Sequence, residues 1–228
     1  MGVEAEPLSE VAPVVVWRLI DAIEKHGLNS DSLYRAPPAT SGPAELRQAL
    51  DSDPLSVDLD QYDVVSLTDA LRGFLQELPV PIIPASVYSE LVYTAQVFQS
   101  LGVGGGGADG QAKFPSPALT SIDQWESQSV EECGERLKRI LECPSIPQAN
   151  QQLLVHLSRH LARVSQHHQS GPRLVGQALS DSVFKHSPLS ADVNPEHHVR
   201  ILEALIATGG LMEIQAAPAF VSALVCNG

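Results

Sequence analysis

Residues 63–84 read DVVSLTDALRGFLQELPVPIIP, and their pattern is the clearest indication of the fold class. Its apolar residues recur every three or four positions, which is the spacing that places side chains on one face of an α-helix; they are Val64, Leu67, Leu71, Phe74, Leu75 and Leu78. Pro79 and Pro81 follow, and they stop the helix because proline lacks the backbone N–H that a helix interior needs. The stretch therefore predicts an amphipathic helix that leads into a proline-bearing segment.

The same period recurs on both sides of this stretch. Further helices are expected over residues 11–27, 43–52, 85–98, 130–143, 148–166, 173–186 and 196–208. No segment alternates apolar and polar residues around a hairpin turn, so no strand is needed to explain the pattern. We therefore expect an all-α fold, a single-domain bundle of about eight helices.

Composition changes abruptly at residues 102–121, which begin with five glycines among six positions and continue with two prolines. Such a composition is typical of a flexible connection, and the segment lacks the G-x-x-x-x-G-K-[ST] pattern of a phosphate-binding loop. The helices before it are too amphipathic to bury one another alone, so the segment is interpreted as an insertion within one domain. We expect a disordered tail over residues 1–10, a domain over 11–210 and an unassigned tail over 211–228.

The charge of the chain argues against several kinds of partner. Lys and Arg number 14 against 27 Asp and Glu, for a net charge of -13. An acidic chain repels the phosphate backbone and anionic lipid surfaces, so neither nucleic acid nor direct membrane insertion is expected. Three cysteines without paired spacing, and the lack of a secretion signal or a long apolar run, indicate a reducing and cytoplasmic setting.

Histidines are the first candidates for intrinsic chemistry. His156 and His160 lie four positions apart on a predicted helix, a spacing that allows two imidazoles to share a metal, but no third ligand is fixed by the pattern. The remaining histidines that enter this comparison are His167, His168, His197 and His198. We interpret all of these as histidines on solvated polar faces, and we predict neither a metal nor another cofactor.

Serine and cysteine give no catalytic pattern. The G-x-S-x-G motif is absent from the sequence, and no serine, histidine and aspartate set follows a known order. Cys133 and Cys143 fall on apolar helix faces or their ends, which is typical of residues that fill a core. Intrinsic hydrolytic or redox chemistry is therefore not supported.

Arg35 raises a different question, because it lies in the polar stretch DSLYRAPP at residues 31–38 between two predicted helices. One interpretation is a residue that stays within its own fold, solvated or paired with Asp31. The other is a guanidinium presented to an anionic partner.

The order of motifs around Arg35 resembles the RhoGAP, or breakpoint-cluster-region homology (BH), domain family. The resemblance covers about residues 10–210 apart from the insertion, and it is carried by the phrases AIEKHGL, SLYR, AELRQ, VDL, FLQELPVPIIP, IPASVYSE and PSIP. Among members of the family, these phrases are most similar to the copy in the regulatory subunit of class I phosphoinositide 3-kinase. The resemblance implies a helical bundle of the GTPase-activation type.

The resemblance also implies roles for particular residues. In the family, an arginine in the loop that SLYR matches enters a Rho-type GTPase and stabilises charge that develops on the nucleotide phosphates; Arg35 takes this position. A lysine and an arginine one helical turn apart hold the site in the family. Matching LRGFLQELP to that helix places Arg72 at the lysine and Gln76 at the arginine, so that one of the two charges is lost.

Other positions also depart from the family. The family motif that ends in Phe, Gly, Pro and Asn reads ALSDSVFKHSPLS here: Phe184 matches, but Lys185, His186 and Ser187 replace the other three residues. Ser32 replaces the glycine that precedes the arginine loop. Because a misplacement of about 1 Å can cost on the order of a hundredfold in rate, these departures predict little or no activation.

From the sequence we therefore expect a non-catalytic domain of a phosphoinositide 3-kinase regulatory subunit that binds GTP-loaded Rho-family GTPases of the Rac or Cdc42 type. Its GTPase-binding residues are predicted to be Arg35, Arg72, Gln76 and Lys185, with Arg35 at the arginine-finger position and not catalytic. The catalytic subunit of the kinase would bind other parts of the full-length protein, and a homodimer is possible. The alternatives are an active GTPase activator that uses Arg35, and a scaffold or dimerisation module.

Overall fold

The computed structural model describes residues 8–30, 33–34, 44–102, 122–167, 171–187 and 190–212. These residues form α-helices and two short 3-10 helices, with no strand in the described part, so the predicted all-α class is confirmed. The elements are α1 Val11–Gly27, α2 Ala44–Ser52, η1 Leu59–Gln61, α3 Val64–Glu77, α4 Ala85–Gly102, α5 Ile122–Leu141, α6 Gln148–His167, α7 Gly171–Phe184, η2 Ser190–Asp192 and α8 Pro195–Ala207.

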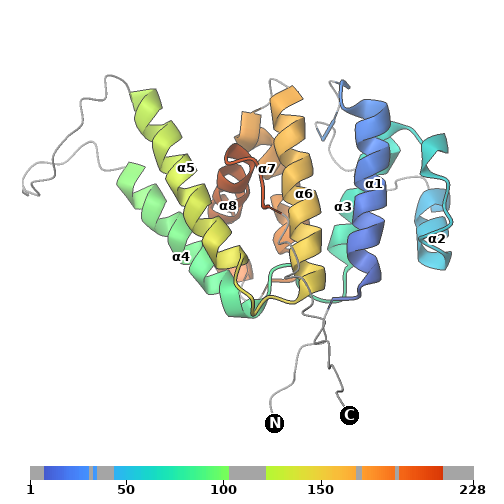
Figure 1. Ribbon diagram of the computed structural model, residues 1–228, viewed down its shortest axis with the longest axis horizontal. Helices are drawn as coiled ribbons and strands as arrows, with labels where there is room; N and C mark the ends of the chain where they lie inside the picture. Colours follow the sequence, from blue (N-terminus) through green and yellow to red (C-terminus); the bar gives the residue numbers. More distant parts are fainter. Residues whose placement is uncertain are drawn as a thin grey trace, which may run out of the picture.

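Helix α6 lies near the middle of the bundle and packs on α1, α7 and α8 (Figure 1). Helix α3 packs on α1 and α7, and α2 lies against α3 at one end of the molecule. Helices α4 and α5 form a pair at the other end and both contact α8. Helix α3 therefore lies between α1 and α7 and contacts both.

Helix α3 forms as its sequence predicts. The carboxylate of Asp63 caps its first turn by accepting a hydrogen bond from the Ser66 backbone N–H at 2.8 Å. Its apolar stripe is buried, with Leu67 and Leu71 fully enclosed. The helix ends at Glu77, before Pro79 removes a backbone donor.

The proline-bearing segment after α3 is fixed by α6. The Asn150 side-chain amide donates to the backbone carbonyl of Pro81 at 3.2 Å and to that of Ile82 at 2.8 Å. Ile82 and Ile83 are buried in the core. The segment that the prolines exclude from helical structure is thus held by a polar side chain and by two buried isoleucines.

Two boundaries differ from the sequence-based expectation. Helix α5 begins at Ile122, whereas the sequence predicted a start at residue 130. The prediction missed this start because the polar stretch IDQWESQS carries no apolar period that would reveal a helix. At the other end of the domain, Leu211 is buried, and its N–H donates to the Ser158 hydroxyl at 2.9 Å. The expected tails and the glycine-rich insertion fall largely on residues 1–7, 103–121 and 213–228, which lie outside the described residues.

None of the helices described here combines the length and the apolar character that crossing a membrane requires.

Glycine allows α5 and α8 to approach closely. A Cβ atom added at Gly134 would overlap the carbonyl oxygen of Ala204 and the side chain of Thr208. Gly73 on α3 is the opposite case, because a Cβ there meets no atom within 4 Å. A substitution at Gly134 therefore tests the close packing of α5 on α8, whereas a substitution at Gly73 tests helix propensity alone.

Gly134→Ala is expected to lower the free energy of unfolding by about 1–3 kcal/mol, because backbone atoms of α8 would have to move. Gly73→Ala is the matched control and should raise it by about 0.5–1 kcal/mol, since alanine favours the helix. Urea denaturation of both variants measures the difference. Equal effects of the two substitutions would show that α5 and α8 do not pack as described.

Candidate functional site

The two described residues that precede Arg35 are anchored in the core. Leu33 and Tyr34 are each 5% exposed. The chain reaches them from α1 through a turn in which the Leu33 N–H donates to the Ser30 carbonyl at 3.2 Å. Tyr34 has φ 57°, a left-handed conformation that is uncommon for a residue with a side chain. Such a conformation persists when surrounding contacts determine it.

Tyr34 is contacted by α3 and α6. Its hydroxyl lies 2.7 Å from Nε2 of His160, a residue of α6 that is fully buried. The guanidinium carbon of Arg72, from α3, lies 5.6 Å from the centroid of the Tyr34 ring, within the range of a cation–π contact. Tyr34 therefore connects the segment before Arg35 to two helices at once.

Arg72 is buried rather than displayed. It is 5% exposed, and its Nη2 atom lies 3.7 Å from Oδ1 of Asp69, one helical turn earlier. A buried guanidinium is stabilised by a carboxylate and an aromatic face. The structure thus places Arg72 against Tyr34, where it can support the residue that precedes Arg35. Direct contact between Arg72 and a GTPase stays a prediction.

Gln76 lies one turn further along α3 and joins it to the end of α7. Its Nε2 donates to the hydroxyl of Ser182 at 3.1 Å, and its backbone carbonyl accepts a hydrogen bond from Nε2 of His186 at 2.6 Å. The structure therefore brings Gln76 close to the α7 terminus that carries Lys185. Lys185 is exposed.

A second pair of a buried tyrosine and a buried histidine contacts Phe184, the last residue of α7. The ring of Phe184 stacks on His198 of α8 with centroids 4.3 Å apart and an interplanar angle of 7°. The Tyr88 hydroxyl lies 2.7 Å from Nε2 of His198. These contacts hold Phe184 in the core while its neighbour Lys185 faces solvent.

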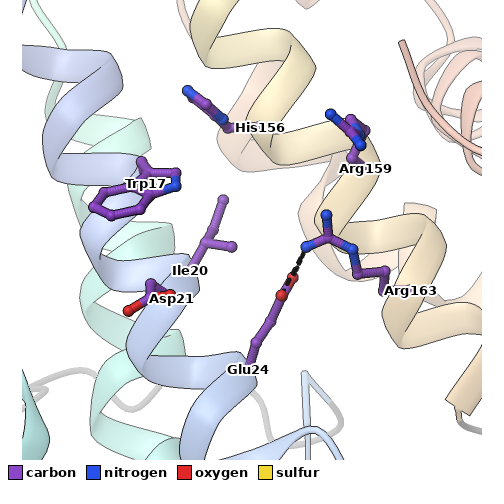
Figure 2. Close-up of a pocket in the computed structure, with 7 residues that line it drawn as sticks. All are labelled: Trp17, Ile20, Asp21, Glu24, His156, Arg159 and Arg163. Atoms are coloured by element: carbon purple, nitrogen blue, oxygen red, sulfur yellow. Dashed lines mark hydrogen bonds and ion pairs between the residues drawn. The ribbon is translucent and has the colours of Figure 1, made fainter. Parts of the chain in front are cut away.

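His160 also contacts a carboxylate that reaches the surface. Its Nδ1 lies 2.9 Å from Oε1 of Glu24 on α1. Glu24 also accepts two hydrogen bonds from Nη1 of Arg163, at 2.8 and 2.7 Å, and Figure 2 shows these two side chains pointing toward each other. The pair lies beside a cavity of about 140 Å³ between α1 and α6, which Trp17 and His156 also line. A chain of polar contacts thus runs from Tyr34 to the surface of the bundle.

Burial and hydrogen bonding fix the charges in this chain. Burial lowers the pKa of His160, against the opposing hydrogen bond to Glu24, so the imidazole is neutral at pH 7. Burial by itself would raise the pKa of Glu24, but hydrogen bonds from His160 and Arg163 hold it below its usual value. Burial raises the pKa of Tyr34, so its hydroxyl keeps its proton.

Several sequence-based predictions can be compared with these positions. Arg35 and His168 lie outside the described residues. The interpretation of the histidines as solvated is wrong for His160 and His198, because each pairs with a buried tyrosine. The core role predicted for Cys133 is confirmed, and burial raises the pKa of its thiol to about 11. In the part of the chain that the structure describes, no three metal-ligating side chains gather.

The sequence analysis missed Tyr34, His160 and Glu24 as a connected group. One signal was present: His160 falls three positions after Leu157 and four before Val164, on the apolar stripe of its helix. A histidine on a buried face needs hydrogen-bond partners. The sequence does not reveal that those partners lie on α1 and beside Arg35.

A comparison with protein-family models matches residues 13–180 to the RhoGAP domain. The chain belongs to the RhoGAP domain family. Among solved structures, the BH domain from GRAF, the GTPase regulator associated with focal adhesion kinase, has a similar fold, with a TM-score of 0.58 and 18% sequence identity. The match covers 91% of this chain and 100% of that one.

Two relatives are similar to this chain over different parts of its length. Rho GTPase-activating protein 45 of Mus musculus is 26% identical over 209 residues, 88% of this chain and 18% of that protein. Unconventional myosin-IXb of Rattus norvegicus is 34% identical over 85 residues, 37% of this chain and 4% of that protein. The chain thus spans less than a fifth of the length of these relatives. Particular closeness to the phosphoinositide 3-kinase subunit is not shown by these matches and stays a prediction.

The prediction of a non-catalytic domain is contradicted by these relatives, because the one that aligns over 88% of the chain is named a GTPase-activating protein. The sequence-based argument gave most weight to lost supporting residues such as the arginine that Gln76 replaces. It did not foresee that Tyr34 is held by Arg72 and His160, or that Gln76 and His186 join α3 to α7. These contacts hold the residue before Arg35 and join α3 to the end of α7.

The neutral, buried His160 predicts a pH-dependent stability. A folded-state pKa below the unfolded value near 6.5 means that the unfolded chain takes up a proton first as pH falls, so stability is present above that pH and lost below it. Between about pH 7.5 and 5.5, the wild type should lose about 1 kcal/mol more than His160→Gln, which cannot titrate. Urea denaturation at both pH values measures this, and equal losses would contradict a neutral His160.

Proposed function

We propose that this domain stimulates GTP hydrolysis by a Rho-type GTPase and that Arg35 supplies the guanidinium that reaches the nucleotide. Family membership over residues 13–180 supports the activity. The observation that carries the role of Arg35 is the anchoring of Tyr34, which is buried, left-handed and contacted by two helices. Arg35 follows this fixed residue directly in the sequence, so the core holds the backbone on the N-terminal side of Arg35.

The chemistry suits an arginine supplied by a second protein. Charge shifts onto the phosphate oxygens as the γ-phosphoryl group is transferred, and a guanidinium stabilises it with planar donors that need no prior protonation. An arginine of this kind contributes about 10³ to 10⁵ in rate, mostly through placement. A rigid attachment immediately before the arginine is therefore the structural feature that such a reaction requires.

The other predicted residues receive distinct roles in this proposal. Arg72 lies beneath Tyr34 and keeps the loop in place. Gln76 keeps α3 and α7 together through Ser182 and His186. Lys185 is exposed beside this junction, and its proposed role is to contact an acidic group of the GTPase. The family resemblance favours a GTP-loaded GTPase of the Rac or Cdc42 type as the partner.

Arg35→Ala should reduce the stimulated rate of GTP hydrolysis at saturating domain by at least about a hundredfold, because the charge on the transferring phosphoryl group loses its stabilising cation. Single-turnover hydrolysis with GTP-loaded Rac and Cdc42 measures the rate. The control is Arg139→Ala, which removes an exposed arginine on α5 and should leave the rate unchanged. A large loss of thermal stability in Arg35→Ala would instead indicate that the side chain serves its own fold.

Lys185→Glu should raise the half-saturating concentration of the domain about tenfold at low salt with little change in the saturated rate, because a reversed charge at the rim of an interface mainly slows association. The difference from wild type should shrink as ionic strength rises. A titration of the hydrolysis rate against domain concentration, at two salt concentrations, measures both effects. An unchanged half-saturating concentration would remove Lys185 from the interface.

A place in a phosphoinositide 3-kinase regulatory subunit is the finer part of the proposal. It is supported by the phrases AIEKHGL, AELRQ and IPASVYSE, which occur in the same order here. In that setting the kinase catalytic subunit binds other parts of the full-length protein, and GTPase binding is coupled to lipid phosphorylation. Co-purification of the full-length protein with a kinase catalytic subunit tests this separately from GTP hydrolysis.

A further inference from the structure

The strongest additional feature is the chain of polar contacts that begins at Tyr34. We propose that Tyr34, His160 and Glu24 form a hydrogen-bonded relay that positions Arg35 for GTP hydrolysis. This inference rests on the proposed function, and it assigns a role to three residues that need not touch the GTPase or its nucleotide. They are positioning residues that act through Arg35.

Each member of the relay lies within hydrogen-bond distance of the next. The Tyr34 hydroxyl lies 2.7 Å from Nε2 of His160, and Nδ1 of His160 lies 2.9 Å from Oε1 of Glu24. Glu24 is held in turn by Nη1 of Arg163 at 2.8 and 2.7 Å. The contacts join the last turn of α1 and the segment that follows it to the middle of α6, which lies 136 positions from Glu24 and 126 positions from Tyr34 in the sequence.

The proton positions allow only one direction of donation. Glu24 is a carboxylate and can only accept, so Nδ1 of His160 carries the proton that it donates. The imidazole is neutral, which leaves Nε2 as an acceptor. Tyr34 must therefore donate its hydroxyl proton to Nε2. This one-way order means that the charge of Glu24 fixes the histidine tautomer, and the tautomer fixes the position of the tyrosine hydroxyl.

The relay accounts for the backbone of Tyr34. A left-handed residue with a large side chain is unfavourable unless its surroundings hold it. Arg72 covers the ring through a cation–π contact, which tolerates some sliding, whereas the hydroxyl bond to His160 fixes the end of the side chain in direction and distance. Loss of that one bond should let the segment move while the ring stays buried.

The molecule provides a matched control for this bond. The Tyr88 hydroxyl lies 2.7 Å from Nε2 of His198, so the same chemical pair occurs at the same distance between α4 and α8. Both hydroxyl bonds are buried, and each joins two residues that are more than a hundred positions apart in the sequence. Tyr34→Phe and Tyr88→Phe therefore remove the same group from two places. Tyr34 adjoins Arg35, whereas Tyr88 lies near the end of α7, where a change would act through Lys185 on the half-saturating concentration and not on the saturated rate.

The experiment compares these two variants in three measurements. The first is hydrogen exchange of the Leu33 amide, which should become about fivefold faster in Tyr34→Phe, the factor expected for one lost buried hydrogen bond, and stay unchanged in Tyr88→Phe. The second is the saturated rate of GTP hydrolysis, which should fall at least about tenfold in Tyr34→Phe alone, with the half-saturating concentration preserved. The third is Tyr34→Phe in an Arg35→Ala background, where no further loss of rate is expected.

Each alternative result has a definite meaning. Unchanged exchange and rate in Tyr34→Phe would overturn the relay, as would equal losses of rate in the two tyrosine variants, because the effect would then be one of general stability. An additional loss in the Arg35→Ala background would show that Tyr34 does not act through Arg35. If the wild type stimulates no Rho-type GTPase, the proposed function fails, while the exchange of Leu33 still decides whether the relay holds the segment.

Discussion

The hydrogen bond between the Tyr34 hydroxyl and Nε2 of His160 is the interaction on which the site depends. It joins residues that are 126 positions apart, and it connects the segment that follows α1 to α6, the helix near the middle of the bundle. Because His160 is fully buried, loss of this bond would leave its Nε2 without a partner in the core, which is costly. The core therefore reaches to Tyr34, the residue immediately before Arg35 in the sequence.

Helix α3 is the second constraint, because it contacts both halves of the site. Arg72 faces Tyr34, and one turn later Gln76 contacts Ser182 and His186 at the end of α7. The helix is rigid at both ends: Asp63 caps its start, and the proline-bearing segment that follows it is held by Asn150. Helix α3 therefore contacts both Tyr34 and the end of α7.

The sequence predicts the helical class well, because burial of an apolar stripe leaves a clear period in helices such as α3 and α6. It fails where burial leaves no such period, as in the polar start of α5 at Ile122. The candidate site is less predictable. Arg35 and Arg72 follow from a family pattern, but the pairing of His160 with Tyr34 and Glu24 depends on how distant helices meet. Local spacing cannot encode that contact, and only the place of His160 on an apolar face indicates it.

The departures from the family pattern are consistent with a site whose support has been redistributed. Placement of a guanidinium requires that its attachment be rigid, and rigidity can come from any set of directional contacts. Arg72 differs from lysine in offering a flat cation that covers an aromatic ring, which a compact ammonium does less well. The pairing of Arg72 with Tyr34, and of Tyr34 with His160, therefore forms a self-consistent unit, in which the change from lysine to arginine suits the aromatic residue beside it. A change at one supporting position is best judged together with the residue that it contacts.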